Sequence, residues 1–335
     1  MKKYNSIDLV KLVMAVLVVA IHTIPMYSHE NFWVARSYRA VVSCAVPFFF
    51  MVSGFFLGKK MKYPYHEKTD RGVLTKYIKK MILLYSVWSI IYIPLAVDNY
   101  IDAELTLKES VMDYIQGFLF VGEHYNSWML WYLLSTVYAL FFVYILLKKK
   151  VKLQILLLIG FCVTILGYGI DYLYLFSNES TFVINAIIKV IDATILHGRI
   201  FQGFFYIPLG MCFANYKISV SKSWILFIAG FIATMITDDM VYYLFQMICM
   251  IGLFSLVIQW ELKESKVYLV CRQLSTIIYF IHMYVWVIFY TVVKGRKTYR
   301  FDYFVATVLI CIAIGLVYIG IKALLTKLRR KIRND

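Results

Sequence analysis

The stretch IDLVKLVMAVLVVAIH (residues 7–22) decides the fold, because it is a long apolar segment interrupted by only three ionisable side chains. A helix needs about 20 such residues to cross about 30 Å of hydrocarbon. Similar segments recur along the chain, in which 62% of the residues are hydrophobic and 16% are charged. Soluble domains are about 45–50% apolar and about 25% charged. The sequence therefore predicts an all-α fold, a polytopic bundle of membrane helices.

Apolar runs separated by charged breaks predict about ten transmembrane helices. Their approximate bounds are 7–28, 38–58, 78–97, 127–147, 153–172, 199–214, 223–237, 241–260, 270–292 and 303–325. Most Lys and Arg residues lie in alternate connections, which the positive-inside rule assigns to the cytoplasm. We therefore predict cytoplasmic termini and a single transmembrane domain, 1–335, with a basic tail at 326–335. The run 182–196 carries Lys189 and Asp192, which predicts a helix at the interface or against the bundle.

The formal net charge of +16 is explained by this topology. Its Lys and Arg residues form short clusters between apolar runs, so we predict no nucleic-acid partner. The six cysteines lie singly in apolar segments without C-x-x-C spacing, which predicts neither a disulfide nor a metal site. The expected location is the plasma membrane, and the abundance of Lys, Ile, Tyr and Phe suggests a bacterial source.

Ionisable side chains inside a predicted span are candidate site residues, because each costs about 2.5–3.5 kcal/mol at the bilayer centre on insertion scales. Asp8, Lys11 and His22 interrupt the first span. Lys11 and His22 are close to three helical turns apart, so they share one face at a separation of about 16 Å along the axis. One interpretation makes His22 a general base at depth. The other makes Asp8 and Lys11 an interfacial ion pair and His22 a packing residue.

The ninth span places Ser275, Tyr279 and His282 at i, i+4, i+7 spacing, so these side chains point the same way. His282 is predicted near mid-membrane, at a depth comparable to that of His22. Alone, such a histidine is more often structural, but two histidines at similar depth favour a shared site. Arg199 opens the sixth span, and it is predicted either to bind an anionic or carbonyl group or to snorkel to lipid headgroups.

These residues lie in an ordered series of motifs that resembles the acyltransferase 3 family of membrane proteins. The first span resembles the family's opening helix, with Lys11 where Arg is usual and His22 eleven residues later. VPFFFMVSGFFL (46–57) is similar to its second-span motif and includes Ser53. Lys76, Lys79 and Lys80 resemble its cationic segment before the third span. SWMLWYL (127–133), GRIFQGFFYIPLGM (198–211) and STIIYFIHMY (275–284) resemble later motifs.

The resemblance implies transfer of an acyl group, commonly acetyl, from cytoplasmic acetyl-CoA to a hydroxyl of a cell-envelope carbohydrate or lipid-linked acceptor. Acyl-CoA is then a co-substrate, and no cofactor is expected to be tightly bound. His22, with His282 and Tyr279, is the expected catalytic group. Lys11, Asp8, Ser53, Arg199 and the lysines of the cationic segment are expected to bind substrate or donor. For any single lysine of that segment, topology alone is a sufficient explanation.

The same motifs also resemble the membrane half of the membrane-bound serine racemases of glycopeptide-resistance clusters. That module is associated with L-serine uptake, so the resemblance implies an alternative function as an amino-acid-transporting module. The polar face of the first span is then a permeation path, and Lys11, His22 and Arg199 hold amino-acid charges. No racemase domain lies within these 335 residues, so we expect the enzyme over the transporter, unless the sequence is the membrane half of a longer protein.

Overall fold

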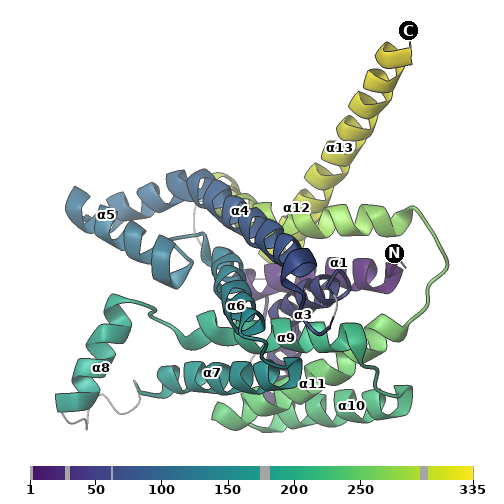
Figure 1. Ribbon diagram of the computed structural model, residues 1–335. Coiled ribbons are helices and arrows are strands. Elements are labelled where there is room, and N and C mark those ends of the chain that lie inside the picture. The colour runs from purple at the N-terminus through teal and green to yellow at the C-terminus, as the bar shows by residue number, and fades with distance from the viewer. Residues whose placement is uncertain (1–2, 27–30, 62, 174–181, 295–300, 335) are drawn as a thin grey trace. The chain divides into compact units, whose positions relative to one another are not determined.

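The computed structural model describes residues 3–26, 31–61, 63–173, 182–294 and 301–334, and no β-strand occurs in these ranges. Figure 1 shows the helices in chain order. They are α1 (Asn5–Thr23), α2 (Phe32–Val42), α3 (Ala45–Gly58), α4 (Glu67–Asp102), α5 (Leu107–Gln116), α6 (Trp131–Lys148), α7 (Leu153–Leu173), α8 (Phe182–Ala193), α9 (Gln202–Asn215), α10 (Val220–Ile236), α11 (Asp239–Gln259), α12 (Val267–Ile288) and α13 (Phe301–Asn334).

Within the described ranges, eight helical segments are long and apolar enough to cross a membrane, and they coincide with eight of the ten predicted spans. The seventh predicted span is α10, an apolar helix of 17 residues. The sixth is α9, preceded by the 3-10 turn Gly198–Phe201. The all-α membrane fold is thus confirmed. The cytoplasmic termini and the single domain stay predictions.

One segment is more helical than the sequence suggested, and another is a helix as predicted. The basic stretch 59–77 is predicted as a connection, but α4 already begins at Glu67. The Asp70 carboxylate accepts the backbone N–H of His66 at 2.9 Å, which satisfies a donor at this helix end. The run 182–196 contains α8, and Gln116 of α5 donates to the carbonyl oxygen of Asp192 at 2.6 Å. The C-terminal end of α8 is therefore attached to α5.

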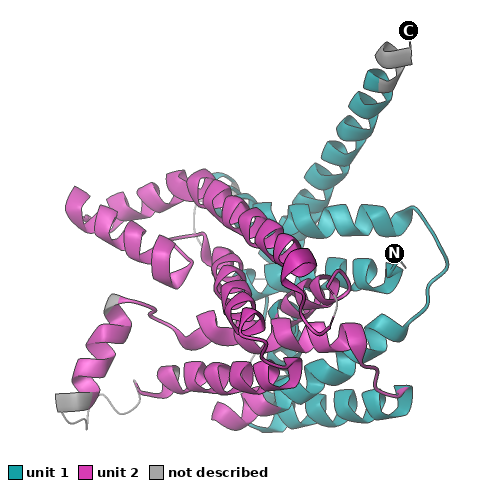
Figure 2. Cartoon of the chain, in the orientation of Figure 1, with its two compact units in different colours: residues 1–46, 220–237, 245–335 teal, residues 47–219, 238–244 magenta. Residues whose placement is uncertain are grey.

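The chain divides into two compact units, which Figure 2 shows in different colours. Unit 1 comprises residues 1–46, 220–237 and 245–335, and unit 2 comprises residues 47–219 and 238–244. In unit 1, α12 packs against both α1 and α13, and α2 packs against α10. The guanidinium groups of Arg36 and Arg39 donate to the carbonyl oxygen of Thr237 at 2.8 and 2.9 Å. These bonds satisfy a carbonyl just after the C-terminus of α10.

In unit 2, α6 packs against α4 and α9, and α9 packs against α7. Small residues allow the closest approaches. A Cβ on Gly54 of α3 would collide with the carbonyl oxygen of Ile207 in α9, and one on Gly210 of α9 would collide with that of Met51. Hydrophobic burial does not drive helices together inside lipid, so close backbone packing of this kind is a main source of cohesion.

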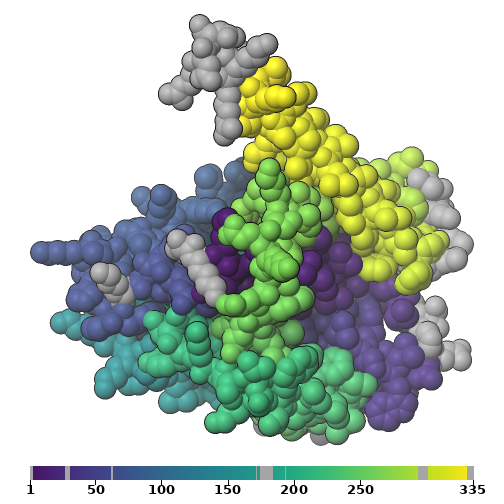
Figure 3. Space-filling view, turned by 90° about the vertical axis from the view of Figure 1, so that its right-hand side faces the viewer, coloured from purple at the N-terminus to yellow at the C-terminus, as the bar shows by residue number. Residues whose placement is uncertain are grey.

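The second half of α13 exposes a belt of large apolar side chains. Leu316, Val317, Ile321 and Leu324 are each at least half exposed. Figure 3 shows this helix in yellow. Soluble proteins rarely leave so large an apolar surface uncovered, whereas a helix in a bilayer is covered there by acyl chains.

We expect Gly54→Ala to destabilise unit 2, because the new methyl group forces α3 away from α9. Overpacking of a tight contact costs about 1–3 kcal/mol. The matched control is Gly72→Ala in α4, where a Cβ meets nothing within 4 Å and a helical Gly-to-Ala change stabilises by up to about 1 kcal/mol. The midpoint of thermal unfolding, measured on each purified variant, reports both changes in stability. Equal midpoints for the two variants would show that the glycine contact is dispensable.

Candidate functional site

The structure brings the two predicted histidines together in unit 1. His22 lies in the last turn of α1 and His282 lies in α12. Their rings are stacked, with centroids 5.3 Å apart and an angle of 27° between the planes. Both belong to helices whose faces were predicted from spacing, and the packing of α1 on α12 joins those faces. The two side chains therefore lie next to each other, as a shared site requires.

The hydrogen bonds of His282 fix its tautomer. Its Nδ1 lies 3.0 Å from the carbonyl oxygen of Ile278 and 2.9 Å from that of Tyr279. Carbonyl oxygens only accept, so Nδ1 carries the proton and donates. In the neutral ring Nε2 then holds the lone pair. That atom is buried and has no hydrogen-bond partner among the described residues. The fully buried His282 thus presents a bare basic nitrogen inside the bundle.

Tyr279 and Ser275, which the spacing placed on the same face as His282, each make contacts within α12. Both are buried on the same part of α12. Tyr279 contributes its carbonyl oxygen to His282, and its ring packs edge-on against Phe280 at 4.9 Å. The Ser275 hydroxyl donates to the carbonyl oxygen of Arg272 at 2.9 Å. The predicted catalytic role of Tyr279 stays a prediction.

A charged group lies about three turns along the helices from the histidines. Asp8 is within electrostatic range of Lys11 on its own helix and of Arg272 on α12. The sequence analysis singled out the first two residues and missed Arg272. The spacing in the sequence could have identified it, because Arg272 precedes His282 by ten residues, much as Lys11 precedes His22 by eleven. The three groups carry a net charge of +1.

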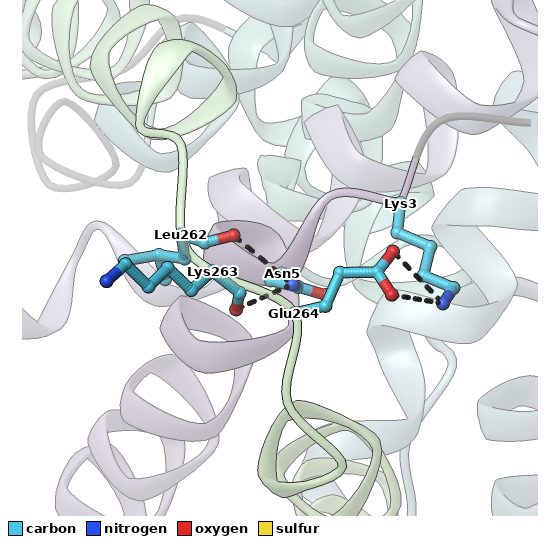
Figure 4. A network of polar contacts seen from close by, with 5 residues as sticks. All are labelled: Lys3, Asn5, Leu262, Lys263 and Glu264. Carbon is cyan, nitrogen blue, oxygen red and sulfur yellow. Dashed lines mark hydrogen bonds and ion pairs between the residues drawn. The ribbon is translucent and has the colours of Figure 1, made fainter.

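The same end of unit 1 is held by a polar network (Figure 4). Lys3 forms an ion pair with Glu264 at 3.2 Å. The Asn5 side chain donates to the carbonyl oxygens of Leu262 and Lys263 at 3.5 and 3.3 Å. The connection between α11 and α12 is therefore bonded to the start of α1, which helps to hold α1 in register with α12.

The other predicted site residues lie in unit 2. The Ser53 hydroxyl of α3 is 3.2 Å from the Tyr132 hydroxyl of α6, and it also bonds Tyr77 of α4. These two tyrosines were not predicted as site residues, since neither has a spacing that sets it apart from the other 26 tyrosines. Lys76, Lys79 and Lys80 are exposed along α4.

Arg199 has an internal partner. Its guanidinium forms an ion pair with the Glu123 carboxylate and lies 5.3 Å from the centre of the Trp131 ring. Burial raises the pKa of Glu123 above its ordinary value, and the charge of Arg199 opposes that shift. The guanidinium is thus paired inside unit 2, and the predicted binding role of Arg199 stays a prediction.

Metal ligation has no candidate in the described ranges, where no three His, Cys, Asp or Glu side chains come together. The His22–His282 pair consists of side chains that can transfer protons. A bare imidazole nitrogen beside a second imidazole can take a proton from a hydroxyl group or carry an acyl group.

Comparison with known proteins places these residues in a family. The model of the acyltransferase domain family known as acyltransferase 3 matches residues 4–320. Similar curated proteins include an amino-acid racemase of Enterococcus faecalis, 28% identical over 314 residues, which are 87% of this chain and 42% of that protein. A serine/alanine racemase of Enterococcus gallinarum is 24% identical over 300 residues, 84% of this chain and 41% of that protein.

The chain therefore spans less than half the length of these relatives. No solved structure matches it significantly. The family match covers the helices that carry both histidines and all the other predicted site residues. The chain belongs to the acyltransferase 3 family and is a multi-pass membrane protein.

Proposed function

We propose that this protein transfers an acyl group, most simply acetyl, from cytoplasmic acyl-CoA to a hydroxyl of a cell-envelope carbohydrate or related lipid-linked acceptor. The stacked pair of His22 and His282 carries the proposal. It supplies proton-transfer chemistry inside a chain that belongs to an acyltransferase family. Burying two imidazoles in apolar helices is costly, and a catalytic task accounts for that cost.

In the proposed reaction, His22 accepts the proton of the acceptor hydroxyl as its oxygen attacks the thioester carbonyl carbon. A new C–O bond forms, the C–S bond breaks, and the CoA sulfur takes up the proton that His22 held. His22 is assigned this role because it is partly accessible, whereas His282 is fully buried. His282, held in one tautomer by backbone carbonyls, orients the acceptor and the neighbouring ring. A second route, in which His22 first carries the acyl group, uses the same residues.

The donor is proposed to lie along α1 with its phosphates near Lys11 and Arg272. Their charges exceed that of Asp8 by one, so the group attracts anions. The distance of about 16 Å from Lys11 to His22 along the helix leaves room for the extended arm of CoA. Ser53, Arg199 and the exposed lysines Lys76, Lys79 and Lys80 remain further proposed binding residues.

A second candidate function is transport of a small amino acid, as the alternative resemblance implied. The names of the relatives favour it, since they act on amino acids and one on serine and alanine. They match this chain over more than four fifths of its length. In this interpretation the histidine pair and Lys11 line a path for a zwitterion.

We expect His22→Ala to lose at least 100-fold in acyl-transfer rate, because general-base catalysis contributes about 10²–10⁴-fold. The assay follows release of CoA thiol and transfer of labelled acetyl groups in membranes that contain the protein. The control is His66→Ala, which removes an exposed imidazole in front of α4 and should retain the wild-type rate. Uptake of labelled serine into proteoliposomes without any CoA release would instead establish the transport function.

Substitution of Lys11 tests the donor position. Lys11→Ala should raise the KM for acyl-CoA about tenfold or more with a smaller change in kcat, because a charged hydrogen bond is worth about 1.5–3 kcal/mol. Lys11→Arg should keep or lower KM, since guanidinium groups bind phosphate in a bidentate manner. An unchanged KM in the alanine variant would exclude Lys11 from the donor site.

A further inference from the structure

A second group of buried polar side chains lies in unit 2, on the loop 122–127 that precedes α6. Gly122 and Asn126 adopt positive φ angles of 81° and 59°, which turn the chain sharply. The Ser127 hydroxyl accepts the backbone N–H of His124 at 2.9 Å and donates to its carbonyl oxygen at 3.1 Å. The loop is therefore closed on itself, and its side chains hold fixed positions.

Several polar atoms of this loop are buried without a hydrogen-bond partner among the described residues. They are both ring nitrogens of His124, which is 5% exposed, and Oδ1 of Asn126, which is 2% exposed. Nε of Arg199 is also buried without a hydrogen-bond partner among the described residues, although another nitrogen of this guanidinium is paired with Glu123 of the loop. Each such atom costs about 1–3 kcal/mol, and native proteins contain few of them. Four in one place indicate a ligand that satisfies them.

The His124 ring is held in position. It stacks on Tyr114 with the ring centres 4.0 Å apart and the planes 8° apart. A Cβ at Gly117 would collide with its Nδ1, so the ring is also packed against the π-helical turn Gly117–Val121. Single π-helical turns are frequent at functional sites.

The charged side chains around the loop already have partners. Glu123 is paired with Arg199, and the Asp113 carboxylate accepts the Tyr100 hydroxyl at 2.7 Å. Burial lowers the pKa of His124 to about 4, so the ring is neutral near pH 7. A charged ligand would lose its hydration, and the charged side chains that could offset this loss are already paired or hydrogen-bonded. The loop therefore favours hydrogen bonding over charge pairing.

We propose that loop 122–127, with Arg199, binds an uncharged small molecule that carries neighbouring hydroxyl or carboxamide groups. Neutral His124 offers the ring nitrogen Nε2, because its Nδ1 lies against Gly117, while Asn126 offers an acceptor and Arg199 offers an N–H. A hydroxyl group both donates and accepts, so two or three of them match this set. Beside these buried atoms, Tyr125 is 41% exposed and the Arg199 side chain is 31% exposed. The site lies wholly in unit 2 and does not depend on the histidine pair of unit 1.

Ligand-induced thermal stabilisation tests this site. The protein is placed in lipid nanodiscs free of sugar-based detergent, and unfolding is followed by tryptophan fluorescence. The uncharged probes are N-acetylglucosamine and N-acetylserinamide. Their charged counterparts are glucosamine, glucuronate and serine. We expect at least one uncharged probe to raise the unfolding midpoint and the charged probes not to do so.

Two variants locate the effect. His124→Phe keeps the ring stack on Tyr114 and removes both nitrogens, and Asn126→Gly removes the amide while tolerating the positive φ. Each should bind the uncharged probe at least tenfold more weakly. Without ligand, His124→Phe should be as stable as wild type or more stable, since two unsatisfied atoms are gone. His66→Phe, the same change at an exposed position of unit 2, is the control and should bind as wild type does.

The proposal is overturned if no uncharged probe stabilises the wild-type protein, or if serine, glucosamine or glucuronate stabilises it equally. It is also overturned if both loop variants keep the full response, because the ligand then binds elsewhere. Loss of acyl transfer in His22→Ala does not bear on any of these outcomes, so the two proposals fail or stand separately.

Discussion

The orientation of His282 depends on one local interaction, the donation of its Nδ1 proton to the carbonyl oxygens of Ile278 and Tyr279. Those carbonyls lie one turn earlier in the same helix, so the ring is held by α12 itself. The bond fixes the tautomer and leaves Nε2 as the atom that can accept a proton. The proposal for the pair combines this fixed ring with the ring of His22, whose centre lies 5.3 Å away.

Polar side chains inside membrane helices indicate where a protein carries out its function. Polar groups inside membrane helices lower the stability of the protein unless they have hydrogen-bond partners. Such groups are therefore retained mainly at functional sites. In unit 1 the charges of Asp8, Lys11 and Arg272 stand at one end of the packed helices and the imidazoles stand about three turns away. Anion binding at the first position and proton transfer at the second are the two tasks of an acyl transfer from CoA. Membership of the acyltransferase 3 family agrees with that division.

Helical periodicity allowed much of this to be predicted. The composition identified the membrane helices, and the spacing of Lys11 with His22 and of Tyr279 with His282 placed each pair on one face. Sequence spacing says nothing about which helix packs against which, so the contact of α1 with α12 required the structure. The same limit hid Arg272, whose partner Asp8 lies 264 residues away, and the pairing of Arg199 with Glu123. The helical start of α4 was missed because charged residues are tolerated in a helix beyond the apolar core of the membrane.

The central claim is that His22 and His282 act as one catalytic unit, and a double-mutant cycle on the acyl-transfer rate tests it most directly. The rates of His22→Ala, His282→Ala and the double variant are measured in the same membranes at equal protein levels. Groups that act as a unit are strongly non-additive. We expect the double variant to be no slower than the slower single variant. Losses that simply multiply would show that the two histidines act independently, which would contradict the shared site.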